Sequence, residues 1–215
     1  QPWWLPEQGF IYLHTRYAAG RNLFWMTSKD GTQWNDPQPL AKVEMGDYQI
    51  SWPHGNCVAT AFDFHPAPVG LNARANIYFL QTCDLGKTWT TPAGAKVSLP
   101  ITNTANSALV YDSRAEGVLV YLKDLNFDAA GNPVILFLTS KGFESGPKND
   151  PRTWRTAHWT AKQWEFKTFT TSDNNYDHGS LYIEPDGTWR IIAPTAAGPQ
   201  PYNPGGEMVM WTSSD

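Results

Sequence analysis

The chain has 215 residues, and its 16 Lys and Arg against 20 Asp and Glu give a formal net charge of −4. This balance argues against a protein held to nucleic acid by phosphate contacts. Charged residues make up 17% and apolar residues 41%, with no apolar run near the ~20 residues that span a bilayer. We therefore expect a soluble folded protein with no nucleic-acid or membrane partner. The 14% aromatic content, with 17 Gly and 17 Pro, favours many short strands joined by tight turns.

One short pattern recurs along the chain: an aromatic-rich strand followed by Ser or Thr, then Asp, Gly and Trp. It occupies residues 22–34 and 77–89, with a degraded copy at 134–140 that continues to Trp154 and a fourth copy beginning at Met208. A hairpin turn explains this pattern: Asp accepts backbone hydrogen bonds, Gly takes a positive φ, and Trp packs between sheets. The pattern predicts a structural staple and not a catalytic group.

Alternating apolar segments between these copies predict the remaining strands. They lie at 10–16, 58–64, 108–111, 118–123, 179–183 and 189–193, with 58–64, 108–111 and 179–183 as inner strands. Together they predict an all-β fold, a β-propeller of four-stranded antiparallel blades at about 1–45, 46–100, 101–170 and 171–215. We expect these four blades to be part of a larger propeller of six or seven blades.

The recurring pattern resembles the Asp-box, or BNR, repeat of sialidase-like β-propellers. Residues 82–89 match that repeat fully, and residues 28–34 are one residue short of it. The resemblance supports the propeller prediction.

In a propeller, the starts of inner strands and the ends of second strands converge on one face. Alignment on the Asp boxes puts 52–56, 103–106 and 176–179 at inner-strand starts, and His14, Arg16 and Lys123 on second strands. We expect a cationic cleft with an aromatic rim. The alternative for each residue is structural, because strand His side chains and aromatics commonly serve packing. The candidate substrate-binding residues are Trp3, Trp4, His14, Trp52, Asn56, Asn106 and Lys123.

Such a cleft suits an anionic polysaccharide or oligosaccharide, because cations pair with carboxylate or sulfate groups and Trp stacks on pyranose faces. β-Elimination from a uronate needs a cation for the carboxylate, a base for the C5 proton and an acid for the leaving oxygen, but no cofactor. Arg16 is the candidate cation. The base is His54 or His178, and the acid is Tyr17 or Tyr176.

Two other functions stay open. A sialidase-like exo-glycosidase would need several Arg on the substrate carboxylate and an activated Tyr nucleophile. Only Arg16 lies in a suitable predicted strand, since Arg74, Arg114 and Arg152 fall in predicted turns or insertions. A non-catalytic glycan-binding propeller would use the same cleft without turnover.

Longer stretches are similar to BNR-type propellers grouped with polysaccharide lyases that cut ulvan or related rhamnose–glucuronate polymers. The similar segments are 12–17, 21–25, the box at Ser28, and 199–211. The resemblance implies a catalytic His, Tyr and carboxylate-neutralising Arg. Arg16 fits that Arg, whereas the Tyr position would precede Gln1. It also implies a secreted or periplasmic protein, monomeric when the propeller is complete, although no signal-peptide pattern stands at the start of this sequence.

Some of those lyases carry a structural zinc bound by His and Cys. The resemblance therefore implies a metal site, for zinc or else calcium, and His54, Cys57, His65 and Cys83 are its possible ligands. If zinc binds there, His178 takes over the role of base. The favoured alternative is two buried free thiols and two unrelated His, and the two Cys do not by themselves indicate a redox compartment.

Overall fold

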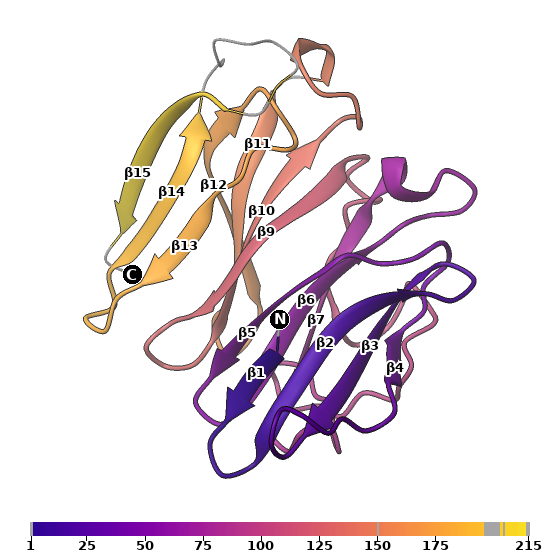
Figure 1. Ribbon diagram of the computed structural model, residues 1–215. Helices are drawn as coiled ribbons and strands as arrows, with labels where there is room; N and C mark the ends of the chain where they lie inside the picture. The colour runs from indigo at the N-terminus through magenta and orange to yellow at the C-terminus, as the bar shows by residue number, and fades with distance from the viewer. Residues whose placement is uncertain (1, 150, 196–202, 204, 214–215) are drawn as a thin grey trace. The chain divides into compact units, whose positions relative to one another are not determined.

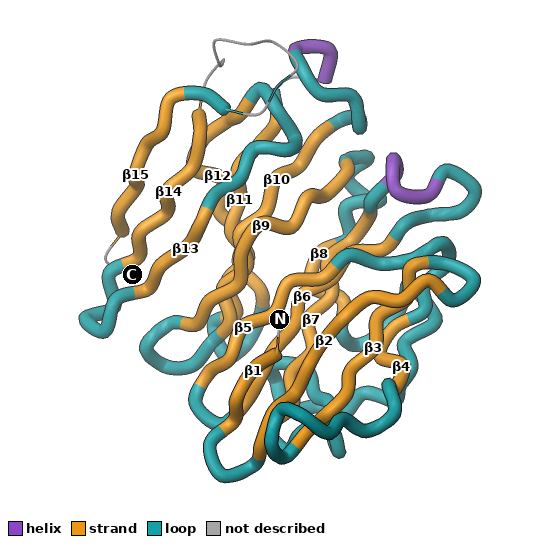
Figure 2. Tube along the Cα trace, viewed as in Figure 1, coloured by secondary structure: helices purple, strands orange, loops and turns teal. Residues whose placement is uncertain are grey.

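A computed structural model describes residues 2–149, 151–195, 203 and 205–213 of the chain. Among these residues, strands dominate and the helices are two short 3-10 turns, η1 (Gly70–Ala73) and η2 (Pro147–Asn149) (Figure 2). None of the helices in the described ranges is long and apolar enough to cross a membrane. The all-β prediction is confirmed.

The chain divides into two compact units, Gln1–Tyr111 and Asp112–Asp215. The first unit contains two four-stranded antiparallel sheets in which sequential strands are neighbours (Figure 1). The first sheet is formed by β1 (Pro2–Leu5), β2 (Gly9–Tyr17), β3 (Arg21–Ser28) and β4 (Gln38–Ala41). The second sheet is formed by β5 (Gln49–His54), β6 (Cys57–Phe64), β7 (Ala75–Thr82) and β8 (Leu109–Tyr111).

The second unit repeats this meander. Its first sheet is formed by β9 (Leu119–Phe127), β10 (Pro133–Ser140), β11 (Arg152–Trp159) and β12 (Trp164–Ser172). Its second sheet, as far as the described residues show, is formed by β13 (Ser180–Ile183), β14 (Trp189–Thr195) and β15 (Glu207–Ser213). Antiparallel meanders of this kind are the blades that the sequence predicts.

The predicted third blade differs in its first strand. Residues 108–111 were expected to begin that blade as an inner strand, but β8 pairs with β7 of the second sheet, with Ile77 opposite Tyr111. The Phe79 N–H donates to the Ala108 carbonyl at 2.9 Å and extends this pairing. The blade boundary predicted near residue 100 is therefore wrong for these residues.

The first two Asp boxes have the predicted turn geometry. Asp84 Oδ1 accepts from the Thr88 N–H and the Thr82 hydroxyl, both at 2.9 Å, and Asp30 accepts equivalent bonds in the first box. Gly86 has a φ of 81°, and a Cβ there would stand 2.4 Å from the Trp25 ring. Glycine is thus required both for the turn and for the close approach of the box to β3.

The degraded third copy does not form a box turn. Ser140 instead donates to the Gly142 carbonyl at 2.7 Å, and Trp154 lies within β11. Its ring is still fully buried, and its indole N–H donates to the Pro194 carbonyl at 2.9 Å. The insertion after Ser140 replaces the tight turn, while the Trp keeps its packing role.

Each unit has its own apolar core between its two sheets. In the first unit, alternate residues of β2 point inward, so Ile11 and Leu13 are buried against residues such as Phe62 of the second sheet. In the second unit, Leu136 and Trp154 are packed in the corresponding core. Each fully buried side chain of this size contributes about 1.5–3 kcal/mol. The cores fix the strand ends that carry the polar groups described next.

Candidate functional site

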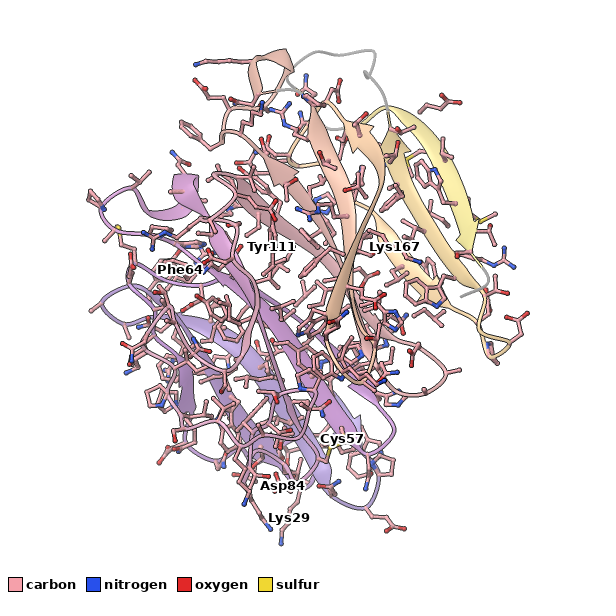
Figure 3. The ribbon with its side chains drawn as sticks, turned by 180° about the vertical axis from the view of Figure 1, so that it is seen from behind. Lys29, Cys57, Phe64, Asp84, Tyr111 and Lys167 are labelled. Carbon is pink, nitrogen blue, oxygen red and sulfur yellow. A yellow bond between two sulfur atoms is a disulfide. The ribbon has the colours of Figure 1, made fainter. Side chains whose placement is uncertain are left out.

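A cleft of about 380 Å³ lies at one end of the first unit, where β2 turns into β3 and β6 ends. We name it the Tyr17–Arg21 cleft. The Asp boxes lie at the other end of these strands; Figure 3 shows Lys29, Cys57 and Asp84 there, and Phe64 at the far end of β6. The residues that line the cleft are Tyr17, Gly20, Arg21, Met45, Tyr48, His65, Val69, Gly70 and Leu71.

The backbone at this end is held by close contact between three segments. The Asp47 N–H donates to the Arg21 carbonyl at 2.7 Å, and the His65 N–H donates to the Gly46 carbonyl at 2.7 Å. Gly46 has a φ of 136°, and a Cβ there would meet the Arg21 backbone at 2.7 Å. Only glycine allows this approach, which places the β2–β3 turn beside the end of β6.

Arg21 is the central cation of the cleft. Its Nε donates to the Tyr17 hydroxyl at 3.0 Å, and its Nη2 donates to the same oxygen. The guanidinium carbon also lies 4.5 Å from the ring centroid of Tyr48 and 5.0 Å from that of Tyr17. The two rings hold the guanidinium beside the cleft, where a planar fork of donors suits a carboxylate.

His65 forms the inner wall of the cleft and is only 3% exposed. Its Nε2 lies 3.6 Å from Asp63 Oδ1, and its ring meets Tyr48 edge-on with centroids 4.7 Å apart. Burial, reinforced by the charges of Arg74 and Arg21, lowers the pKa of His65 to about 4. The imidazole is therefore neutral at pH 7.

Two buried carboxyl groups lie behind this wall. Burial raises the pKa of Asp63 to about 7, although the Tyr48 N–H donates to it at 2.9 Å and Arg74 is near. Burial and the neighbouring Asp63 raise the pKa of Asp47 to about 8. The guanidinium carbon of Arg74, which does not line the cleft, lies 4.8 Å from the Tyr48 centroid. Tyr48 therefore contacts two guanidinium groups.

The predicted residues of β2 separate onto its two faces. Tyr17 lines the cleft, whereas Arg16 and His14 point to the opposite face of the strand. The Arg16 guanidinium lies 5.9 Å from the Phe24 centroid, and His14 is stacked on Tyr12 at 4.9 Å. Burial lowers the pKa of His14. Arg21, at the start of β3, is the arginine that lies beside Tyr17, and Arg16, the predicted cation, is not in this cleft.

The predicted group at 52–56 lies at the opposite end of the first unit from the Tyr17–Arg21 cleft. It precedes the predicted inner strand 58–64, but this strand is β6, the second of its sheet: Trp52 and His54 end β5, and Gly55 and Asn56 form the turn into β6. The Asn56 carbonyl accepts from Gln8 of the β1–β2 turn at 3.2 Å. Gly55 has a φ of 54°, so this sequence is a hairpin turn. His54 is therefore not near Tyr17, which corrects the predicted convergence.

The predicted aromatic and amide residues of the first unit have packing or turn contacts. Trp3 donates to the Ser51 hydroxyl at 2.9 Å and meets Trp52 edge-on at 5.5 Å. Trp4 is on the other face of β1, half exposed and packed on Phe10. Asn106 closes its own turn by accepting from the Ala108 N–H at 2.9 Å. None of them lines the Tyr17–Arg21 cleft.

The predicted residues of the second unit form a separate group at the start of β13. Lys123 donates to the Asn175 carbonyl at 2.9 Å, and Tyr176 meets Tyr121 edge-on with centroids 5.9 Å apart. His178 follows in an exposed position. Here the strand-start prediction for residues 176–179 agrees with the structure, and the Lys amine is already engaged by a backbone carbonyl.

The predicted zinc ligands do not meet. Cys57 and Cys83 form a disulfide, which removes both thiolates and also overturns the free-thiol alternative. His54 lies before β6 and His65 after it, at opposite ends of that strand. No group of three or more His, Cys, Asp or Glu suited to a metal ion occurs among the described residues. The proposed ligand set therefore does not fit zinc.

Sequence reasoning missed Arg21, Tyr48 and the role of His65. The sequence signal that could have indicated them is the glycine at position 46. In the structure Gly46 has a positive φ and allows the close approach of residues 20–21 to residues 45–48. Such an approach joins segments that are distant in sequence, so strand alternation alone does not reveal it.

Fold and site together define a protein built of β-propeller blades with a cationic, aromatic cleft. A model of the BNR repeat-containing family matches residues 11–175, and the chain belongs to this family. No curated protein matches the sequence significantly.

Several solved structures share the fold. An ulvan lyase of polysaccharide lyase family 25, bound to a glucuronate–sulfated rhamnose ligand, superposes with a TM-score of 0.74 at 16% identity, over 100% of this chain and 52% of its own. The polysaccharide lyase Uly1 gives 0.63 at 10% identity, over 99% and 49%. A Dyadobacter fermentans protein of unknown function gives 0.57 at 13% identity, over 89% and 60%. The chain thus spans about half the length of the two lyases.

Proposed function

We propose that the protein is a polysaccharide lyase that cleaves a uronate-containing polymer by β-elimination in the Tyr17–Arg21 cleft. The observation that carries the proposal is the Arg21 guanidinium, held between two Tyr rings and bonded to the exposed Tyr17 hydroxyl beside a neutral His. The fold shared with ulvan lyases is consistent with this function.

Arg21 supplies the first requirement of the reaction. A guanidinium that binds the uronate carboxylate neutralises its charge and stabilises the negative charge that develops when C5 loses its proton. His65 adds no competing positive charge, because it is neutral, and its edge contact fixes the Tyr48 ring under Arg21. His65 is thus a positioning residue.

Tyr17 is the group that moves the proton. Its side chain is 79% exposed, and Arg21 Nε donates to its hydroxyl oxygen at 3.0 Å. In the proposed step, a deprotonated Tyr17 takes the C5 proton; the C4–O4 bond breaks as the C4=C5 double bond forms, and the resulting hydroxyl returns the proton to the leaving O4. The sequence assigned Tyr17 the acid role, and this step adds the base role.

The rim of the cleft supports a polymer that alternates a uronate with a 6-deoxy sugar. Met45, Val69 and Leu71 are 44%, 60% and 45% exposed, and they form an apolar edge beside the cation. A methyl-bearing sugar such as rhamnose presents a matching apolar face. The polymer we favour is therefore ulvan-like, with glucuronate at Arg21 and rhamnose at this edge.

The Cys57–Cys83 disulfide supports a secreted or periplasmic location, because such bonds persist in oxidising compartments. The proposed substrate, an anionic polysaccharide, would be encountered in such a compartment.

The test is formation of unsaturated product from ulvan and other uronate polymers, followed by ultraviolet absorbance and by product mass. Elimination gives a product one water lighter than hydrolysis. We expect Arg21→Ala to lower the rate at least ~100-fold, the usual cost of losing a charge-stabilising donor. Arg16→Ala, its neighbour on the opposite face, should change the rate by less than about threefold. Absence of unsaturated product from every uronate polymer, or equal losses in both variants, would overturn the proposal.

A further inference from the structure

A second cleft, of about 450 Å³, lies between the outer strands of the first sheet and the Asp-box hairpin of the second sheet. We name it the Trp25–Trp89 cleft. It shares no lining residue with the Tyr17–Arg21 cleft. Its lining residues are Trp25, Gln38, Pro39, Gly86, Lys87, Thr88, Trp89, Lys96, Val97, Ser98, Leu99 and Pro100.

The floor of this cleft is aromatic and rigid. The Trp25 and Trp89 ring centroids are 6.0 Å apart, and Gly86 presses its backbone on the Trp25 ring. Trp89 is 2% exposed, and neither indole N–H has an acceptor among the described residues. Buried Trp N–H groups normally find an acceptor, so an unpaired one indicates that water or a ligand supplies it. Both of these donors belong to residues that line the cleft.

The rim is cationic. The exposed residues Lys87 and Lys96 both line the cleft, and no Asp or Glu does. Asp84, three residues before Lys87, accepts hydrogen bonds from Thr88 and Thr82 within the box, and the charge of Lys87 helps to lower its pKa. On a chain with a net charge of −4, this local excess of positive charge favours an anionic ligand.

The two Lys are brought together by backbone pairing. The Val97 N–H donates to the Trp89 carbonyl, and the Thr91 N–H donates to the Ala95 carbonyl, both at 2.9 Å. This short hairpin returns Lys96 to the box that carries Lys87, while Gln38, Thr88 and Ser98 add groups that can bond sugar hydroxyls. The cations therefore lie on a fixed frame over an aromatic floor.

We propose that the Trp25–Trp89 cleft is a separate binding site for an anionic sugar residue, with Lys87 and Lys96 on its sulfate or carboxylate and the partly exposed Trp25 indole against its pyranose ring. Such a site would hold a polymer chain on the outer edge of the first unit. It does not depend on lyase activity, because binding here requires no reaction at Tyr17 or Arg21.

The experiment is calorimetric titration of the Arg21→Ala protein, which removes turnover, with three polymers: a sulfated galactan without uronate, a polyuronate without sulfate, and a neutral dextran. We expect Lys87→Ala combined with Lys96→Ala to weaken binding of the sulfated galactan, the polyuronate or both at least ~10-fold and to reduce the salt dependence. The charge-matched control, Lys29→Ala combined with Lys42→Ala, should stay within about twofold.

The two anionic polymers distinguish sulfate from carboxylate as the recognised group, and preference for either supports the site. Equal binding by the Lys87/Lys96 variant and its control would overturn the proposal, as would dextran binding as tightly as the anionic polymers. If the proposed lyase function alone were wrong, no unsaturated product would form, but polymer binding in the Trp25–Trp89 cleft would remain.

Discussion

Arg21 in the first unit and Arg152 in the second show two uses of the same side chain. Arg21 is partly exposed and faces two Tyr rings and an open cleft. Arg152 is fully buried, and its guanidinium donates at 2.7 Å to the carbonyls of Gly146 and Asp173 and at 2.5 Å to that of Glu144. A guanidinium can therefore bind a ligand only where backbone carbonyls do not already accept hydrogen bonds from its N–H groups.

The two arginines should differ most in how much each contributes to the free energy of unfolding. Arg152→Met should lower the free energy of unfolding by about 3–5 kcal/mol, because three carbonyls around this fully buried side chain lose a charged donor. Arg21→Met should cost less than about 1 kcal/mol. Urea unfolding of both variants measures this. Similar losses would show that Arg21 is structural as well.

The Cys57–Cys83 disulfide gives the second comparison of the two units. Both cysteines lie in the first unit and close a loop with a sequence separation of 26 residues. Replacing both with Ser should cost about 3 kcal/mol. Hydrogen exchange should show the loss in strands β6 and β7 and leave β10 and β11 protected as before. Unchanged exchange in β6 and β7 would contradict the assigned bond.

Two glycines of similar φ give a matched pair across the units. Gly86 and Gly187 have φ values of 81° and 87°, but a Cβ would hit the Trp25 ring at Gly86 and meet nothing within 4 Å at Gly187. Gly86→Ala should therefore cost about 2–3 kcal/mol and Gly187→Ala about 1 kcal/mol. Thermal unfolding of both variants is the check, and equal costs would mean that the box does not press on β3.

The smallest expected effect concerns the buried carboxyls of the first unit. Above pH 3.8 the unfolded Asp47 ionises, while the folded group keeps its proton up to about pH 8, so unfolding free energy falls as pH rises through this window. Asp63 acts in the same direction up to about pH 7, and His65 acts oppositely between pH 4 and 6.5. Asp63 interacts with both of the other groups: its Oδ1 lies 3.6 Å from His65 Nε2, and its charge helps to raise the pKa of Asp47.

Asp47→Asn should therefore flatten the fall in stability between pH 5 and 8, by up to about 1.4 kcal/mol per pH unit. Unfolding by urea at several pH values measures the slope. An identical slope in Asp47→Asn and the parent chain would place the ionised form of Asp47 in the folded state.

The sequence was sufficient for local features. The strand alternation and the Ser/Thr, Asp, Gly and Trp pattern predicted the meander and both Asp-box turns, because these depend on residues within one hairpin. The site was harder, since Arg21, Tyr48 and His65 meet only through long-range contacts around Gly46. The error at 52–56 came from overlooking Gly55 as a turn residue, and the zinc error from two cysteines that pair across β6 and β7.

The proposed elimination takes place at Tyr17 of the first unit and not at the Tyr176 group of the second. The most direct measurement is the initial rate of unsaturated product formation from ulvan by Tyr17→Phe and Tyr176→Phe, each of which removes one hydroxyl and keeps its ring. We expect Tyr17→Phe to lower the initial rate at least ~100-fold and Tyr176→Phe to keep it within about threefold of the parent rate. Full activity of Tyr17→Phe, with loss in Tyr176→Phe, would contradict it.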